Sequence, residues 1–176
     1  MYRLTDIYKQ IKEEETATQV SQYKIFCDMD GVLCDFDKRF DQFGGMSPEE
    51  YKSKYGDKEF ESLIGKVGAQ FWAKMPWMSD GKQLWKSIEK YNPSLLSAPS
   101  EEASSRYGKH LWVKENLPGT KLILANKEKK KNYSKKNRIL IDDRQDTIQE
   151  WNARGGIGIL HTSAENTINQ LQKLGL

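Results

Sequence analysis

The stretch Tyr23-Lys24-Ile25-Phe26-Cys27-Asp28-Met29-Asp30-Gly31 joins a short apolar run to two carboxylates spaced two positions apart. Residues 23–27 are β-prone and predict a buried strand. The apolar run ends abruptly where the aspartates begin. We therefore expect a strand that delivers Asp28 and Asp30 to its carboxyl end.

Apolar runs of similar length recur along the rest of the chain and alternate with helical patterns. We predict further strands over residues 94–97, 121–125, 138–142 and 157–160, and helices over about 81–90, 100–116, 145–153 and 163–174. The strands are continuous apolar runs, which is typical of a parallel sheet covered on both faces. The predicted fold class is α/β, with a three-layer, Rossmann-like core around a five-stranded parallel sheet.

Residues 36–78 differ from the rest of the chain because they hold nine of its 19 aromatic side chains. Gly44-Gly45 breaks this segment, and Ser47-Pro48-Glu49-Glu50 then predicts a helix start with a capping box. We interpret residues 36–78 as a small helical cap inserted after the first strand. Residues 1–35 and 79–176 then form the core domain.

The composition excludes several classes of protein. A net charge of +3 over 176 residues does not predict nucleic-acid binding. No run approaches 18 apolar residues, so no membrane span is expected, and the N-terminus does not resemble a secretory signal. Cys27 and Cys34 do not suggest a disulfide framework. We expect a cytoplasmic protein, with an amphipathic helix over residues 2–15 packing on the main body.

The ends of three predicted strands carry the polar residues from which we predict the chemistry. They are Asp28 and Asp30, Ser97, and Asp142 with Asp143. Ligands of open parallel sheets bind at these carboxyl ends. Four carboxylates there would repel and resist ionisation, a conflict that a hard cation such as Mg²⁺ removes. Taken singly, each aspartate pair is equally well explained as a turn or a helix cap.

Two of these segments resemble motifs of the haloacid-dehalogenase-like phosphatases. The run Asp28-Met29-Asp30-Gly31-Val32-Leu33 is similar to their first motif, DxDGxx, and Ile141-Asp142-Asp143 to their fourth. Ser97 and a lysine before the fourth motif resemble the second and third, which are weaker. The longer run DMDGVLCDF, with IDDR and the place of the cap, resembles the 5'(3')-deoxyribonucleotidase branch. The resemblance covers about residues 23–161.

The resemblance implies a phosphatase mechanism with a covalent intermediate. Asp28 would attack phosphorus to form an aspartyl-phosphate, and Asp30 would protonate the leaving oxygen and later activate water. The Asp30 backbone carbonyl, Asp28, and Asp142 or Asp143 would hold Mg²⁺. Ser97 and a lysine would hold the phosphate oxygens.

The sequence leaves open which lysine contacts the phosphate. The candidates are the lysines at 127, 129, 130 and 131. When the spacing of the family's motifs is counted backward from Ile141-Asp142 and forward from Ala125, it favours Lys130, with Lys131 next. Lys109 resembles a second phosphate-contacting lysine of the branch, although an exposed helix lysine is an equal interpretation. Ala98 stands where related nucleotidases often place a second hydroxyl.

The aromatic residues of the cap have two interpretations. Most would form the small core that a helical insertion needs. A nucleobase also requires flat faces to stack on. Phe36 matches a base-contacting phenylalanine of the branch, and Phe71-Trp72 resembles its base-stacking pair, so all three are expected to bind substrate.

The function predicted from the sequence is a Mg²⁺-dependent phosphomonoesterase acting on nucleoside or deoxynucleoside monophosphates. Two alternatives remain, a polynucleotide 3'-phosphatase and a non-enzymatic binding module. The segment from Lys127 to Arg138 holds seven basic residues and one acidic residue, where an anionic phosphate would arrive. A closing cap argues against polynucleotides, and no membrane partner is expected. Base, sugar, phosphate position and oligomeric state are not predicted.

Overall fold

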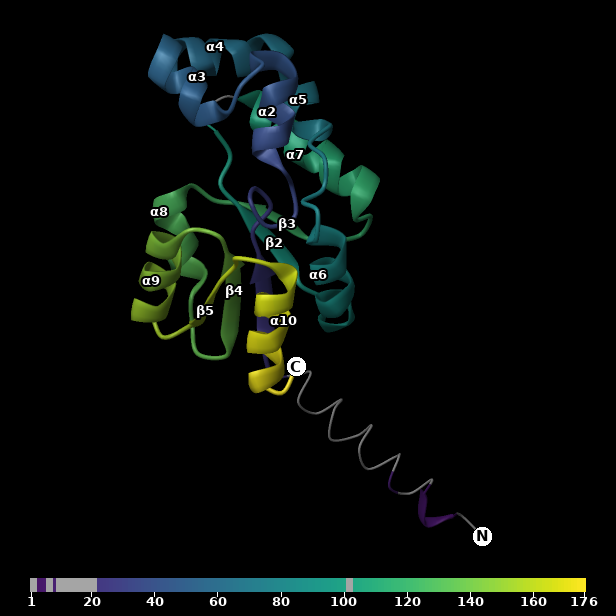
Figure 1. The fold of residues 1–176 in the computed structure, drawn as a ribbon. Coiled ribbons are helices and arrows are strands. Elements are labelled where there is room, and N and C mark those ends of the chain that lie inside the picture. The colour runs from purple at the N-terminus through teal and green to yellow at the C-terminus, as the bar shows by residue number, and fades with distance from the viewer. Residues whose placement is uncertain (1–2, 6–7, 9–21, 101–102) are drawn as a thin grey trace.

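The computed structural model describes residues 3–5, 8, 22–100 and 103–176 (Figure 1). The strands are β1 (Lys24–Cys27), β2 (Ser94–Ser97), β3 (Leu122–Leu124), β4 (Arg138–Asp142) and β5 (Ile157–Leu160). The helices of the core are α6 (Gly81–Ile88), α7 (Ala103–Asn116), α8 (Lys127–Lys130), α9 (Gln145–Ala153) and α10 (Ala164–Lys173), with 3₁₀ turns η1 (Glu89–Tyr91) and η2 (Lys131–Tyr133). Between β1 and α6 lie α2 (Phe36–Gly44), α3 (Pro48–Tyr55), α4 (Asp57–Val67) and α5 (Ala69–Ala73).

The five strands form one parallel sheet in the order β3-β2-β1-β4-β5. β1 occupies the centre, and Cys27 pairs with Leu95 of β2 on one side and with Ile141 of β4 on the other. This register aligns the ends of β1, β2 and β4 at one edge of the sheet. The predicted α/β class and five-stranded parallel sheet are confirmed.

Successive residues of each strand point to opposite faces, so the sheet has two apolar surfaces. On one face, Ile25 and Cys27 pack in a cluster with residues of α6, α7 and α10. On the other, Phe26 packs against Trp151 of α9, with ring centroids 5.5 Å apart. Figure 1 shows α8 and α9 on one side of the sheet and α6 and α10 on the other. The three-layer prediction is therefore also confirmed.

The segment between β1 and α6 is helical, as predicted, and lies beyond the carboxyl edge of the sheet (Figure 1). The predicted capping box is present at the start of α3. The backbone N–H of Glu50 donates to Ser47 Oγ, and the Glu50 carboxylate accepts from the Ser47 backbone N–H. Inside the cap, aromatic rings pack on one another, with Phe40 and Phe60 at a centroid distance of 4.7 Å.

Two connecting segments that lie side by side join the cap to the core. Cys34, leaving β1, forms an antiparallel bridge with Trp77, which leads back toward α6. The Asp35 N–H donates to the Pro76 carbonyl at 2.8 Å, and the Met78 N–H donates to the Leu33 carbonyl at 2.8 Å. Entry to the cap and exit from it are thus held together by backbone hydrogen bonds.

Helices α5 and α7 provide a further contact between cap and core. The contact is close because α7 presents Gly108 to α5. A Cβ atom at this position would collide with the Ala69 carbonyl oxygen and with Trp72 Cβ. The backbones approach at a distance that only glycine permits.

The N-terminal helix predicted over residues 2–15 lies largely outside the described residues. Leu4 and Tyr8, two of its apolar positions, are described and are exposed. Cys27 and Cys34 are both buried and free. In the part of the chain that is described, no helix has the length and apolar character needed to cross a membrane.

Gly108→Ala tests the close approach of α5 and α7. Although alanine favours a helix over glycine, the overpacked contact is expected to lower the free energy of unfolding by about 1–3 kcal/mol. Chemical denaturation measures the change. The matched control is His110→Ala in the exposed part of the same helix, which should be nearly neutral. Equal stability of the two variants would show that α5 is not packed tightly on α7.

Candidate active site

The end of β1 places two aspartates at the carboxyl edge of the sheet. The Asp28 N–H donates to the Ile141 carbonyl at 2.9 Å, which continues the pairing with β4. The chain then turns tightly, and the backbone N–H groups of Leu33 and Cys34 both donate to the Met29 carbonyl. Gly31 adopts a φ of 74°, a left-handed conformation that glycine accepts without strain.

Carboxylates from β1 and β4 meet at this edge. One oxygen each from Asp28, Asp142 and Asp143 lies within 4.8 Å of the others. Asp142 ends β4 beside β1, and the Asp143 carboxylate lies against Gly31, where a Cβ atom would collide with it. Three hard oxygen donors at this spacing fit a Mg²⁺ ion, which prefers carboxylates and completes its coordination with water or substrate. The predicted metal residues Asp28, Asp142 and Asp143 are thus brought together.

Lys130 lies among the same carboxylates. Its ammonium Nζ is 2.7 Å from Asp28 Oδ2 and 2.8 Å from Asp142 Oδ2, and the residue is only 2% exposed. The positive charge offsets part of the repulsion between the two acids. Of the lysines that the sequence left open, the structure brings Lys130 to the aspartates.

Burial and mutual repulsion raise the pKa values of these acids. Desolvation first, and then the charge of Asp28, raise the pKa of Asp142 to about 6, despite its pairing with Lys130. The same two causes raise the pKa of Asp143. Desolvation also raises the pKa of Asp30, and Lys109 only partly opposes it. The site therefore favours a cation or a proton.

Asp30 belongs to a separate network beside this cluster. Lys109 of α7 is fully buried, and its Nζ donates to Asp30 Oδ2 and, at 2.9 Å, to Ser97 Oγ. Lys109 is therefore a buried residue of the site, and the alternative of an exposed helix lysine does not hold. Asp30 Oδ1 is buried and has no hydrogen-bond partner among the described residues. The predicted metal contact through the Asp30 backbone carbonyl stays a prediction.

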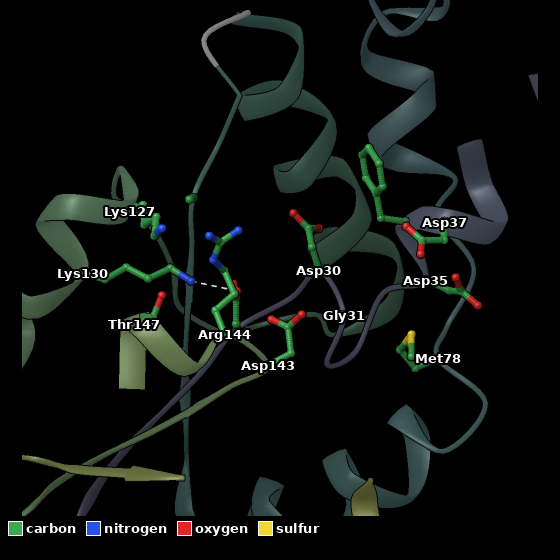
Figure 2. Close-up of a pocket in the computed structure, with 13 residues that line it drawn as sticks. Asp30, Gly31, Asp35, Asp37, Met78, Lys127, Lys130, Asp143, Arg144 and Thr147 are labelled. Atoms are coloured by element: carbon green, nitrogen blue, oxygen red, sulfur yellow. Dashed lines mark ion pairs between the residues drawn. The ribbon is translucent and has the colours of Figure 1, made fainter. Parts of the chain in front are cut away.

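A cavity of about 470 Å³ opens above the aspartates. Its lining, most of it labelled in Figure 2, consists of Asp28, Asp30, Gly31, Asp35, Phe36, Asp37, Met78, Ala98, Lys127, Lys130, Asp143, Arg144 and Thr147. Figure 2 shows Lys127 and Lys130 on one side, Asp35 and Asp37 on the other, and Asp30 and Asp143 between them. The cavity thus has a basic side and an acidic side.

The predicted substrate-binding aromatics fall into two groups. Phe36 lines the cavity. Phe71 and Trp72 do not line it, because they are 1% and 4% exposed and pack in the cap core against Phe36, with centroid distances of 5.3 and 5.6 Å. Trp72 Nε1 has no hydrogen-bond partner in the described part of the chain. Contact of Phe71 and Trp72 with substrate stays a prediction.

The predicted phosphate residue Ser97 is not among the residues that line the cavity. It is fully buried, and its hydroxyl accepts a hydrogen bond from Lys109. The neighbouring residue, Ala98, lines the cavity in its place. A contact between Ser97 and phosphate therefore also stays a prediction.

Sequence reasoning did not assign several residues of the cavity. Arg144 follows Asp143 directly, and its backbone N–H donates to Asp142 Oδ1 at 3.0 Å. Thr147 projects from the first turn of α9. Both residues follow Asp142-Asp143 closely in the sequence, and this position could have identified them. Asp35 caps α2 by accepting from the Lys38 N–H, and Asp37 follows in its first turn.

The chain resembles several solved structures. A hydrolase from Streptococcus pneumoniae TIGR4 superposes with a TM-score of 0.55 at 15% identity, over 88% of this chain and 100% of that one. A HAD-superfamily hydrolase from Ehrlichia chaffeensis has a TM-score of 0.53 at 14% identity, over 87% and 97% of the two chains. One from Geobacter sulfurreducens PCA, of subfamily IA, has a TM-score of 0.51 at 12% identity, over 87% and 96%.

The chain shares its fold with these HAD-superfamily hydrolases. At such low identity the likeness concerns the fold alone. No protein-family model and no curated protein matches the sequence. The resemblance to the haloacid-dehalogenase-like group is thus supported at the level of the HAD fold, with an aspartate cluster at the expected edge of the sheet, of which Asp28 and Asp142 are buried.

The raised pKa of Asp142 predicts pH-dependent binding of Mg²⁺. A protonated carboxyl is no ligand, so the proton and the metal compete below about pH 6. Titration calorimetry should show the Mg²⁺ affinity falling about tenfold from pH 7.5 to pH 5. Asp142→Asn should bind more weakly and lose most of this dependence. A dissociation constant that does not change over this range would contradict the prediction.

Gly31→Ala tests the contact between the β1 turn and Asp143. The added methyl meets the Asp143 carboxylate and strains a residue at positive φ. We expect a loss of about 1 kcal/mol in stability and at least about tenfold weaker Mg²⁺ binding. Gly119→Ala is the matched control, since Gly119 has a φ of 84° and open space around it. It should share the loss of stability and keep the Mg²⁺ affinity; equal Mg²⁺ affinities of the two variants would show that Gly31 does not position Asp143.

Proposed function

We propose that this protein is a Mg²⁺-dependent phosphomonoesterase that dephosphorylates nucleoside or deoxynucleoside monophosphates. One observation carries the proposal. The Asp28 carboxylate lies in the cavity within reach of a buried lysine and two further carboxylates, and Asp30 lies two residues further on. A nucleophile, a cation and an acid are therefore arranged around one small volume.

Asp28 is positioned to attack a phosphate bound in the cavity. Its Oδ1 accepts the Met29 N–H at 2.8 Å, which fixes the carboxylate plane, and Lys130 pairs with Oδ2. Attack of a carboxylate oxygen on phosphorus forms an aspartyl-phosphate and breaks the bond from phosphorus to the alcohol oxygen. Water then cleaves the aspartyl-phosphate, releases inorganic phosphate and restores the carboxylate.

Asp30 is suited to move the proton in both steps. Its raised pKa allows it to carry a proton to the departing alcohol oxygen and then to accept one from the attacking water. Oδ1 has no partner among the described residues, while Lys109 holds Oδ2. Lys109 thus orients the Asp30 side chain through Oδ2, while the buried Oδ1 is left unpaired among the described residues.

The carboxylates of Asp28, Asp142 and Asp143 would hold Mg²⁺, which when bound neutralises phosphate charge and orients the phosphoryl group. Lys130 adds a positive charge in contact with Asp28 and Asp142. The basic side of the cavity, with Lys127 and Arg144, suits the outer phosphate oxygens. Each of these groups lowers the electrostatic cost of bringing a dianionic substrate to a carboxylate.

The other side of the cavity supports a nucleoside as the leaving group. Phe36 offers an aromatic face for a base, and Asp37 offers an acceptor for amino or hydroxyl groups. The cap places both residues above the aspartates, where the alcohol side of the substrate would lie. The cavity of about 470 Å³ is of the size that small-molecule ligands occupy.

A phosphate-release assay tests the proposal. The purified protein is incubated with nucleoside 5'- and 3'-monophosphates, their deoxy forms and simple sugar phosphates, with Mg²⁺ or with EDTA. We expect release that requires Mg²⁺ and is fastest with nucleotides. Asp28→Asn should lower kcat at least about 1,000-fold, because it removes the nucleophile.

The matched control is Asp41→Asn, an equal loss of charge at an exposed position of α2. It should retain the wild-type rate. Hydrolysis by Asp28→Asn at the wild-type rate would exclude the aspartyl-phosphate mechanism. Equal rates on sugar phosphates and nucleotides would support phosphatase activity but would overturn the proposed preference for nucleotides.

A further inference from the structure

A second hollow, of about 390 Å³, lies at the carboxyl end of β3. Arg106 from the first turn of α7 and Lys129 from α8 contribute the charged side chains of its lining. Asn126, Asn132 and Tyr133 contribute further polar groups. Among the described residues, this lining contains no carboxylate. It is a concave surface with several hydrogen-bonding side chains and two positive charges, beside the apolar Leu124 and Ala125.

The two cations of this hollow, Arg106 and Lys129, differ from the neighbouring lysines in their ion pairing. Lys127 pairs with Asp146, and Lys131 pairs with Glu150 at 3.1 Å. Lys129 and Arg106 are exposed and form no ion pair within the described part of the chain. Within the described residues, the positive charge of this segment is therefore paired on the α9 side, and these two cations of the hollow have no carboxylate partner.

The hollow is a neighbour of the active-site cavity. Lys127 and Lys130 of α8 line the cavity, while Lys129 of the same short helix lines the hollow. Ala98, just after β2, lines the cavity, and Ala125, just after β3, lines the hollow. Since β2 and β3 are adjacent and parallel, and β1 lies one strand further, the hollow is on the order of 10 Å from Asp28.

We propose that this hollow binds a second phosphate group of the same substrate while the first lies over Asp28. This inference rests on the proposed function and narrows its substrate class. The guanidinium of Arg106 can bind a phosphate with two parallel hydrogen bonds, and the ammonium of Lys129 adds a point charge. The substrate would be a nucleotide with two separate phosphates, supplied either by a nucleoside bisphosphate or by the next phosphodiester of an end-phosphorylated oligonucleotide.

Steady-state kinetics with matched substrates test the inference. The three substrates are a nucleoside 5'-monophosphate, the same nucleoside with phosphates at both 3' and 5', and a 5'-phosphorylated tetranucleotide that begins with this nucleoside. We expect kcat/KM to rise about tenfold for a substrate with a second phosphate, and the gain to shrink as salt rises. A gain only with the bisphosphate identifies a small substrate, and a gain only with the tetranucleotide identifies a strand end.

Arg106→Gln/Lys129→Gln should bring the ratio of the two-phosphate to the one-phosphate kcat/KM close to one. The control is Lys136→Gln, an exposed lysine of the same basic segment that lies outside the hollow, and it should preserve the ratio. A wild-type ratio near one, or a gain that survives in the double variant, overturns this inference while the phosphatase remains. Absence of hydrolysis of every phosphomonoester overturns the proposed function and this inference together.

Discussion

The active-site edge of the sheet depends on one interaction, the pairing of the Lys130 ammonium with the buried carboxylates of Asp28 and Asp142. Asp28 and Asp142 have oxygens within 4.8 Å of each other and are almost completely buried. Two ionised carboxylates at this distance repel by about 3–4 kcal/mol in a medium of effective dielectric 20. The ammonium of Lys130 contacts both and offsets part of this repulsion. Desolvation first, and then the repulsion that remains, raise the pKa of Asp142, and a divalent cation is favoured at this position.

The topology of the sheet explains why these groups meet. β1 is central and β4 is its neighbour, so the residues that follow the two strands are adjacent although they lie far apart in sequence. Lys130 lies on α8, which follows β3, and Lys109 lies on α7, which follows β2. Each crossover between parallel strands thus contributes a side chain to the same edge, which is the usual place for a ligand in such folds.

The fold could be predicted further from the sequence than the site. Continuous apolar runs and their polar ends located β1, β4 and the aspartates, because strand burial and strand ends are local properties. The sequence could not decide between a buried and an exposed Lys109, since that depends on the contact between α7 and the β1 turn. The structure places Phe71 and Trp72 in the cap core, and their contact with substrate stays a prediction, because aromatic composition alone cannot distinguish packing from stacking.

The two connecting segments at Cys34 and Trp77 also have a consequence for how such a protein can diversify. The cap leaves and rejoins the core at neighbouring points, so its length and sequence can change without disturbing the register of β1 with β2 and β4. Selection could therefore alter the part that contacts the leaving group while the phosphate chemistry stays constant. The same arrangement makes this cap a natural unit for exchange between related proteins.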